Sequence, residues 1–318
     1  PGHPPTNRRA CGMHDVHLTE PAVLTAPTWI ARARAHRARV RVWTGPHKER
    51  RSRREKHPVY DFLFQYYMYS AAKLEAWHPN TGEAIADSPE ARERFTAPAY
   101  RTDDGAIRRD PSALTEVQME ALRENLHVLE ATQEKPPNFG CFGVHEWAMV
   151  YRGHDIRHAE IAPLRLPQKE VDAFVESRPV ACSHFDAFRF FAPEAKPLNR
   201  IDLEWKTRHE MEQPGCIHAN MDLYRWAYAS MPWIGSDLLW DSFELATELR
   251  VLDMQATPYD LSSLGFEPVR VETPEGRSEY QSRQRALAAR AEALRSRLIA
   301  TLESVLSLRV PSENPAFQ

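Results

Sequence analysis

The chain has 318 residues, 42% of them hydrophobic and 27% charged, which is ordinary for a globular protein of one large or two small domains. No stretch of 18 uncharged apolar residues is present, and the first 26 residues lack the apolar centre of a secretory signal. The four cysteines lie far apart without a Cys-x-x-Cys pair, which argues against a zinc ribbon or a disulfide framework. We therefore expect a cytoplasmic protein.

The net charge of −3 conceals one strongly basic segment. Residues 32–56 hold eleven Lys or Arg against two Glu, a local balance of +9, so the rest of the chain carries −12. Such a segment on an acidic body predicts an anionic partner, and DNA is the candidate. The alternative is a solvated helix face that forms ion pairs with the body.

The sequence pattern of the N-terminal third predicts a tail, helices and loops. Residues 1–26 are rich in Pro and His without periodicity and predict a disordered tail. Helical patterns, with Thr28 as a cap and Gly45-Pro46 as a stop, cover residues 28–43, 46–56 and 57–69. Residues 79–112 contain scattered Pro, Gly and charge and predict loops with short elements at most.

After residue 112 the sequence pattern changes twice. Residues 115–132 repeat apolar side chains at helical spacing. Short apolar runs bounded by Gly and Pro then predict strands over residues 141–151, 161–166 and 180–191, although the first run fits a helix equally well. The last third predicts helices over residues 214–230, 236–254 and 273–308.

These patterns predict one mainly helical α+β domain. Its helices would pack around a small antiparallel sheet over residues 27–310, and residues 311–318 would form a second tail. A heptad-like stripe marks the last helix at Tyr280, Leu287, Leu294, Leu298 and Val305. The stripe predicts either a homodimer surface over residues 280–305 or packing on the core of its own domain.

The first candidate site is His145-Glu146-Trp147. His145 and Glu146 can exchange protons near neutral pH once burial adjusts their pKa values, and Trp147 offers a stacking face for a planar ring. The two polar residues act together only on a helix or turn, because neighbours on a strand point to opposite faces. Met149 replaces the second histidine of a His-Glu-x-x-His zinc protease, which excludes that class. The alternative is a buried pair beside a core Trp.

Two further pairs combine His with a carboxylate. His184 and Asp186 would share one face of a strand, and His218 and Asp222 would project together from a helix. His184, His218 and Asp222 are therefore the candidate metal ligands, since His with carboxylate suits Fe(II) or Zn(II). Structural hydrogen bonds and a surface ion pair are the alternatives for these pairs.

Aromatic residues follow directly on the basic segment. Tyr66 and Tyr67 could stack on extruded bases while Arg51 and Arg53 hold phosphates, as in proteins that bind nucleic acid. The alternative is that the aromatic side chains are core. A P-loop, a Gly-x-Gly-x-x-Gly fingerprint and a Gly-x-Ser-x-Gly elbow are all missing from the sequence, which excludes the common nucleotide-dependent transferases and serine hydrolases.

Four strings resemble one bacterial family, whose members usually carry the label 3-methyladenine DNA glycosylase. They are HPVYDFLF at residues 57–64, FGVHEWAMVYR at 142–152, CSHFDAFRFF at 182–191 and LDMQATPYDL at 252–261. The resemblance covers residues 28–308 and implies a DNA-repair N-glycosylase that releases alkylated purines without a cofactor. The Gly-Pro-Gly hairpin and catalytic Asp of the large helical glycosylase superfamily are missing from the sequence, so no catalytic residue is carried over.

The implied chemistry assigns roles to the candidate residues. The catalytic group would comprise Glu146, His145 and Asp186, because a carboxylate must activate water or stabilise the sugar cation. Substrate would be bound by Trp147, Tyr66, Tyr67, Arg152, Arg51 and Arg53. Two other functions stay open: a metal-dependent oxygenase or hydrolase with Fe or Zn at the His and Asp residues, and a non-catalytic binding protein.

Overall fold

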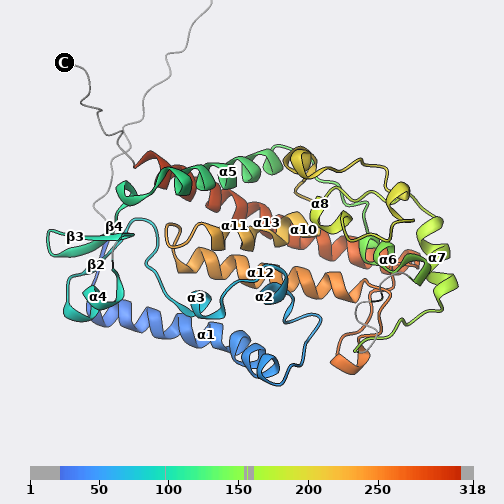
Figure 1. Ribbon diagram of the computed structural model, residues 1–318, viewed down its shortest axis with the longest axis horizontal. Coiled ribbons are helices and arrows are strands. Elements are labelled where there is room, and N and C mark those ends of the chain that lie inside the picture. Colours follow the sequence, from blue (N-terminus) through green and yellow to red (C-terminus); the bar gives the residue numbers. More distant parts are fainter. Residues whose placement is uncertain (1–21, 97, 154–155, 157–160, 309–318) are drawn as a thin grey trace, which may run out of the picture.

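The computed structural model describes residues 22–96, 98–153, 156 and 161–308. Its centre consists of two long helices packed on each other, α12 (Ser236–Gln255) and α13 (Pro274–Ser307). Helices α10 (Ile217–Met221) and α11 (Leu223–Ala229) pack along α12, and α5 (Glu116–Gln133) packs along α13. In Figure 1, α5 and α1 (Ala26–Ser52) flank this centre on opposite sides.

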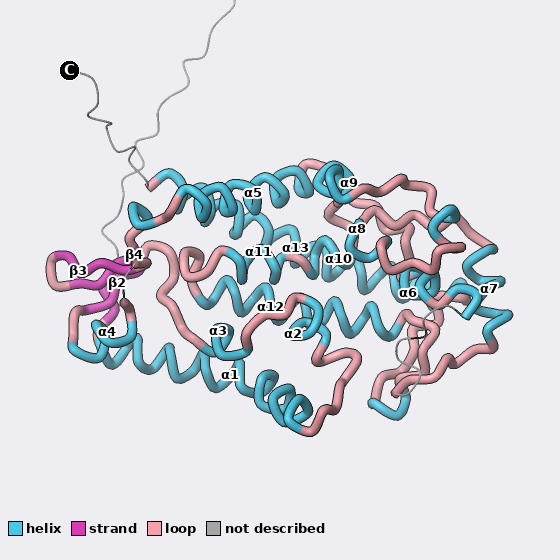
Figure 2. The backbone as a smooth tube through the Cα atoms, viewed as in Figure 1, coloured by secondary structure: helices cyan, strands magenta, loops and turns pink. Residues whose placement is uncertain are grey.

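A small sheet lies at one end of the molecule, beside α4 (Pro89–Arg94) (Figure 2). Its strands are β1 (Ala22–Leu24), β2 (Glu83–Ala86), β3 (Tyr100–Asp103) and β4 (Ala106–Arg109), in the order β1-β2-β4-β3. The pairing is antiparallel except between β1 and β2, which run parallel, so the sheet is mixed. Ile85 and Ile107 pack with Trp29 in a separate small core. The expected mainly helical α+β class is confirmed.

Short helices and turns cover the other end of the central helices. They are α6 (Val144–Met149), α7 (Gln168–Glu176) and α8 (Phe185–Phe188) (Figure 1). The remaining short helices are α2 (Phe62–Tyr66), α3 (Ala71–Glu75) and α9 (Arg208–Met211). The main core includes Trp147, Tyr224, Phe243 and Tyr280, which are among the largest fully buried side chains.

The strands expected over residues 141–151, 161–166 and 180–191 are wrong, whereas the helix that the first run fitted equally well is present. The first segment forms α6 and a 3₁₀ turn, and the third contains α8. Only isolated bridges occur, from Leu164 to Tyr259 and from Val180 to Asn199. These runs are apolar because they lie in the main core, not because one face of a strand is covered. The sheet instead uses strands of three or four residues, too short to display alternation.

Helix α1 also differs from the expected pair of helices. It begins at Ala26 and continues through Pro46 to Ser52, and β1 occupies part of the expected tail. Pro46 leaves the carbonyl of Val42 without its helical donor, and Val42 is 69% exposed, so water can solvate that carbonyl. Side-chain contacts hold the second half of α1: buried Asp61 accepts hydrogen bonds from His47 (2.9 Å) and from Nε of Arg50 (2.9 Å).

The long C-terminal helices and α5 match expectation. Thr115 caps α5 in a capping box with Gln118, and Thr273 caps α13. Residues 214–230 form α10 and α11 where one helix was expected, and residues 57–69 contain only the short α2. The stripe on α13 is buried in the core of its own chain at all positions but Leu287, which is half-buried against that core.

Residues 1–21 and 309–318, which hold most of the expected tails, lie outside the described residues. Within the described part, no helix combines the length and apolarity needed to cross a bilayer.

We predict that one glycine tolerates replacement by alanine and that another does not. A Cβ at Gly276, in the first turn of α13, would lie 2.0 Å from the carbonyl oxygen of Arg270, so Gly276→Ala is expected to lower the free energy of unfolding by about 2 kcal/mol. Gly45 has nothing within 4 Å, and Gly45→Ala should stay within about 1 kcal/mol of wild type, since better helix propensity opposes the restriction before Pro46. Urea denaturation measures both; equal losses would contradict the packing of α13.

Candidate functional site

Three short segments bring histidines to the C-terminal half of α12. His145 comes from α6, His218 from α10, and His184 is the residue before α8. The chain enters α6 through Gly143, whose φ of +71° is left-handed and whose Cβ position lies 3.1 Å from the Cβ of Ala256. A side chain is therefore disfavoured at 143, and the tight entry presses His145 against α12.

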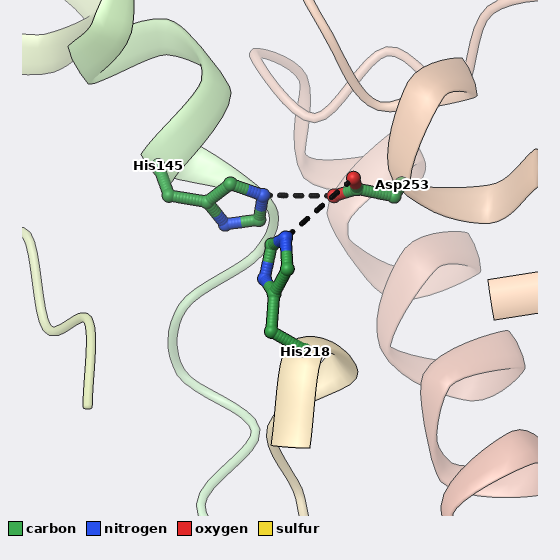
Figure 3. Close-up of side chains that lie close together, drawn as sticks. All are labelled: His145, His218 and Asp253. Carbon is green, nitrogen blue, oxygen red and sulfur yellow. Dashed lines mark hydrogen bonds and ion pairs between the residues drawn. The ribbon is translucent and has the colours of Figure 1, made fainter. Parts of the chain in front are cut away.

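The first group of converging side chains is His145, His218 and Asp253 (Figure 3). Nε2 of His145 lies 2.8 Å from Oδ1 of Asp253, and Nε2 of His218 lies 3.9 Å from Oδ2. The two imidazole rings meet edge to face with centroids 4.4 Å apart. Asp253 and His145 are buried, and His218 is nearly so.

Arg250, one turn before Asp253 on α12, connects this group to Glu146. Its Nη1 donates to Oδ2 of Asp253 at 2.7 Å and to Oε1 of Glu146 at 3.0 Å. The guanidinium also lies 3.9 Å from the ring centroid of Phe62. Glu146 is thus engaged in a buried ion pair, and His145 and Glu146 contact different partners although they are neighbours in sequence.

The second group is His184, Glu212 and Asp222, all buried. Nε2 of His184 lies 3.3 Å from Oδ2 of Asp222 and 3.8 Å from Oε1 of Glu212. The ligand atoms of the three residues all lie within 4.8 Å of one another. Among the described residues, the carboxylate of Glu212 has no hydrogen-bond donor, and Nδ1 of His184 has no partner.

His218 joins the two groups. Its ring is stacked on that of His184 with centroids 5.4 Å apart. Within the described part of the chain the ring makes no hydrogen bond. Of the expected metal ligands, the structure therefore brings His184 and Asp222 together in one group and places His218 in the neighbouring one.

Burial and charge set the protonation of the cluster. Burial disfavours the charged form of His145 and of His184, but the carboxylates of Asp253 and Asp222 outweigh it and raise both pKa values. Burial, reinforced by the charge of His145, keeps the pKa of His218 well below its ordinary value. Burial likewise raises the pKa of Glu212. His218 is thus neutral, the form in which an imidazole binds a metal.

A pocket of about 420 Å³ adjoins the second group. Its lining is aromatic and charged, and consists of Tyr66, Tyr67, Tyr69, Phe185, Asp186, Arg189, Trp205 and Arg225. The hydroxyl of Tyr67 donates to Oδ1 of Asp222 at 2.5 Å, and Nη1 of Arg225 lies 3.7 Å from Oδ2. The wall between the pocket and the buried carboxylate is therefore one side chain thick.

The candidate residues divide between this pocket and other places. Tyr66, Tyr67 and Asp186 line the pocket together, and Asp186 accepts a hydrogen bond from Arg225 at 3.0 Å and forms an ion pair with Arg189 at 3.0 Å. Trp147 is fully buried and donates to the carbonyl of Ala256, so it presents no stacking face to a pocket.

The expected arginines lie outside the pocket. Arg152 has its guanidinium over the ring of Tyr151, 5.1 Å from the centroid. Arg51 lines a separate groove of about 920 Å³ formed by the end of α1 and residues 54–72, and Arg53 is exposed beside it. The structure therefore does not gather Arg152, Arg51 and Arg53 around one site.

Sequence reasoning missed Glu212, Asp253 and Arg250. Asp253 and Arg250 lie three residues apart on one face of α12, a spacing that predicts an ion pair but gives no hint of His145 as third member. Glu212 follows α9 in an irregular, charged stretch that carries no periodic signal.

No protein-family model, no curated protein and no solved structure matches this chain. The arrangement of side chains is therefore the ground for a functional conclusion.

We predict that Arg250 is far more important for stability than a surface arginine. Arg250→Met leaves Glu146 and Asp253 buried without their cation and should cost about 3–5 kcal/mol. The control Arg297→Met removes an exposed pair with Asp241 (2.7 Å) and should cost less than about 1 kcal/mol. Similar losses in urea denaturation would contradict the burial of the network.

The loss should also depend on pH. The carboxyl pKa of Asp253 is lowered in the folded protein, because His145, His218 and Arg250 together outweigh its burial. The stability it contributes is therefore present above the ordinary carboxyl range and disappears as the pH falls through the lowered pKa. The deficit of Arg250→Met should be largest near neutral pH and shrink in acid.

Proposed function

We propose that this protein is a metal-dependent enzyme with its catalytic ion at His184, Glu212 and Asp222. The observation that carries the proposal is the convergence of three buried ligand atoms within 4.8 Å of one another. An imidazole with two carboxylates is a donor set that suits Fe(II) or Zn(II). Such a site leaves coordination positions for water or substrate, as catalytic sites require.

The electrostatics of the second group favour a cation there. Two buried carboxylates, Glu212 and Asp222, lie close together, and the guanidiniums of Arg208 and Arg225 act on Glu212 from outside the group. A buried charge is costly unless it is paired, and the carboxylate of Glu212 has no donor among the described residues. A divalent ion would compensate both carboxylates at once.

The adjoining pocket supports a catalytic rather than a purely structural role. Its tyrosines with Phe185 and Trp205 offer flat apolar surfaces, and Arg189 and Arg225 offer two cations against the single carboxylate of Asp186. A planar, anionic substrate fits this lining. Tyr67 and Arg225 touch both the pocket and Asp222, so movement of either would expose the ion to substrate.

The ion would act as a Lewis acid or lower the pKa of a bound water. Arg225 would orient the anionic group of the substrate, and Tyr67 is placed to hold a proton between the pocket and Asp222. The identity of the metal assigns the reaction class: redox-inactive zinc serves hydrolysis, whereas iron with open positions serves oxygenation.

We predict that Glu212→Gln removes one equivalent of metal from protein purified without chelator, or weakens its binding by about 100-fold or more. The matched control is Glu210→Gln, two residues away and 59% exposed at its side chain, which should leave the metal content unchanged. Elemental analysis gives the content, and circular dichroism verifies the fold. His184→Gln is the second ligand variant. Metal-free wild-type protein that also fails to take up added Fe(II) or Zn(II) would overturn the proposal.

A second candidate function is removal of an alkylated base from DNA, which the resemblance to the glycosylase-labelled family implies. One observation favours it: Tyr69 borders both the aromatic pocket and the basic groove at the end of α1. A strand in the groove could thus place one extruded base between Tyr66 and Tyr67. Asp186, and not the buried Glu146, is then the carboxylate that faces the base.

The groove provides the test of this second function. Arg51 lines it, whereas Arg53 does not. We predict that Arg51→Ala lowers DNA affinity and reduces the slope of its salt dependence by about 1, while Arg53→Ala has a smaller effect. Asp186→Asn should abolish release of free base from alkylated DNA. Unchanged binding in Arg51→Ala, or no release by the wild type, would exclude DNA repair.

A further inference from the structure

A small cavity of about 10 Å³ lies beside the first group of side chains. Its walls include His145, His218, Cys141, Cys182, Tyr280 and Gln284. The volume is enough for about one water molecule. Unlike the pocket beside Asp222, this cavity is too small to hold a substrate.

Two buried polar atoms at this cavity lack partners. The hydroxyl of Tyr280 and Oε1 of Gln284 make no hydrogen bond within the described part of the chain, although both side chains are almost completely buried. Nε2 of Gln284 is occupied, since it donates to the carbonyl of Gly215 at 2.8 Å. Unpaired buried polar atoms are rare in native proteins and indicate an ordered water or ion.

Two imidazoles and a carboxylate lie beside the same cavity. The ligand atoms of His145, His218 and Asp253 lie within 4.8 Å of one another (Figure 3). Arg250 binds one oxygen of Asp253 and leaves the other facing His145. With His145 and His218 neutral, as metal binding requires, the carboxylates of Glu146 and Asp253 together exceed the charge of Arg250 by one, so the group retains one negative charge for a cation.

We propose that His145, His218 and Asp253 bind a second metal ion, with a structural role and a water in the small cavity as a further ligand. The two groups differ in access: the cavity beside the first has room for about one water, whereas the pocket beside the second has room for a substrate. Zn(II) fits the two imidazoles and one carboxylate. The metal-bound water donates its hydrogens toward Gln284 and Tyr280, which accounts for their unpaired atoms.

The second ion ties together segments that are far apart in sequence. His145 lies on α6, His218 on α10 and Asp253 near the end of α12. Because α6 and α10 are only five or six residues long, their own backbone hydrogen bonds stabilise them little. The ion therefore fixes the end of the molecule that also carries His184. Its ligands are distinct from those of the catalytic ion, so the two sites can be tested separately.

His218→Gln is the sharpest test. In metal-free protein the ring of His218 makes no hydrogen bond among the described residues, so the variant should fold with a melting temperature close to that of the wild type. Zn(II) added to metal-free wild type should bind at two equivalents and raise the melting temperature by about 5 °C or more. In His218→Gln one equivalent and most of the increase should disappear.

Three variants distinguish this site from the catalytic one. His184→Gln should retain one equivalent of Zn(II) and the thermal stabilisation, and His145→Gln should lose the same equivalent of Zn(II) as His218→Gln. The control His209→Gln, which alters a half-buried histidine that lies 3.8 Å from Glu210 and outside both groups, should bind two equivalents. Binding of one equivalent that is lost in His184→Gln and kept in His218→Gln would overturn the second site while leaving the catalytic site intact. Two equivalents in every variant would show adventitious binding and overturn it as well.

Discussion

The contact of Arg250 with Asp253 and Glu146 is the interaction on which the site depends. The guanidinium lies between two buried carboxylates, on α12 and α6, and lowers the free-energy cost of burying both. With Asp253 held in place, His145 and His218 approach the same carboxylate from α6 and α10. Stacking of His218 on His184 then connects this group to Asp222 and the pocket. One charged contact in the core thus positions side chains from four segments.

The fold shows which elements can be predicted from local sequence patterns and which cannot. Helices α5, α12 and α13 could be predicted because caps such as Thr115 and Thr273 and long apolar periodicities are local signals. The course of α1 through Pro46 could not, because Asp61 and Glu75, brought near by the fold, hold its second half. Apolar runs around α6 and α8 suggested strands, since burial on all sides and strand formation produce similar sequences. Part of the basic segment forms ion pairs with the body of the protein, as the alternative to an anionic partner requires: Arg39 pairs with Asp237 of α12, whereas Asp241 and Glu248 of α12 pair with α13.

The sequence predicted the location of the candidate site better than it predicted which residues form it. His145, His184, His218 and Asp222 were identified from short motifs, and the structure gathers them in one buried cluster. Their grouping depends on Glu212 and Asp253, which come from segments without a motif. The two groups also differ in surroundings that no sequence pattern reveals: Asp222 lies one side chain from an open pocket of about 420 Å³, and His145 borders a cavity of about 10 Å³. This difference separates the proposed catalytic ion from the structural one.

The most direct test of a metal centre in this cluster is anomalous X-ray diffraction from crystals grown with Zn(II), with data collected above and below the zinc absorption edge. The account predicts one anomalous peak among the ligand atoms of His184, Glu212 and Asp222 and another among those of His145, His218 and Asp253. Ligand distances near 2.0–2.2 Å are expected for nitrogen and oxygen donors. Absence of anomalous density from both positions, with His145 and His184 still paired directly to their carboxylates, would contradict it.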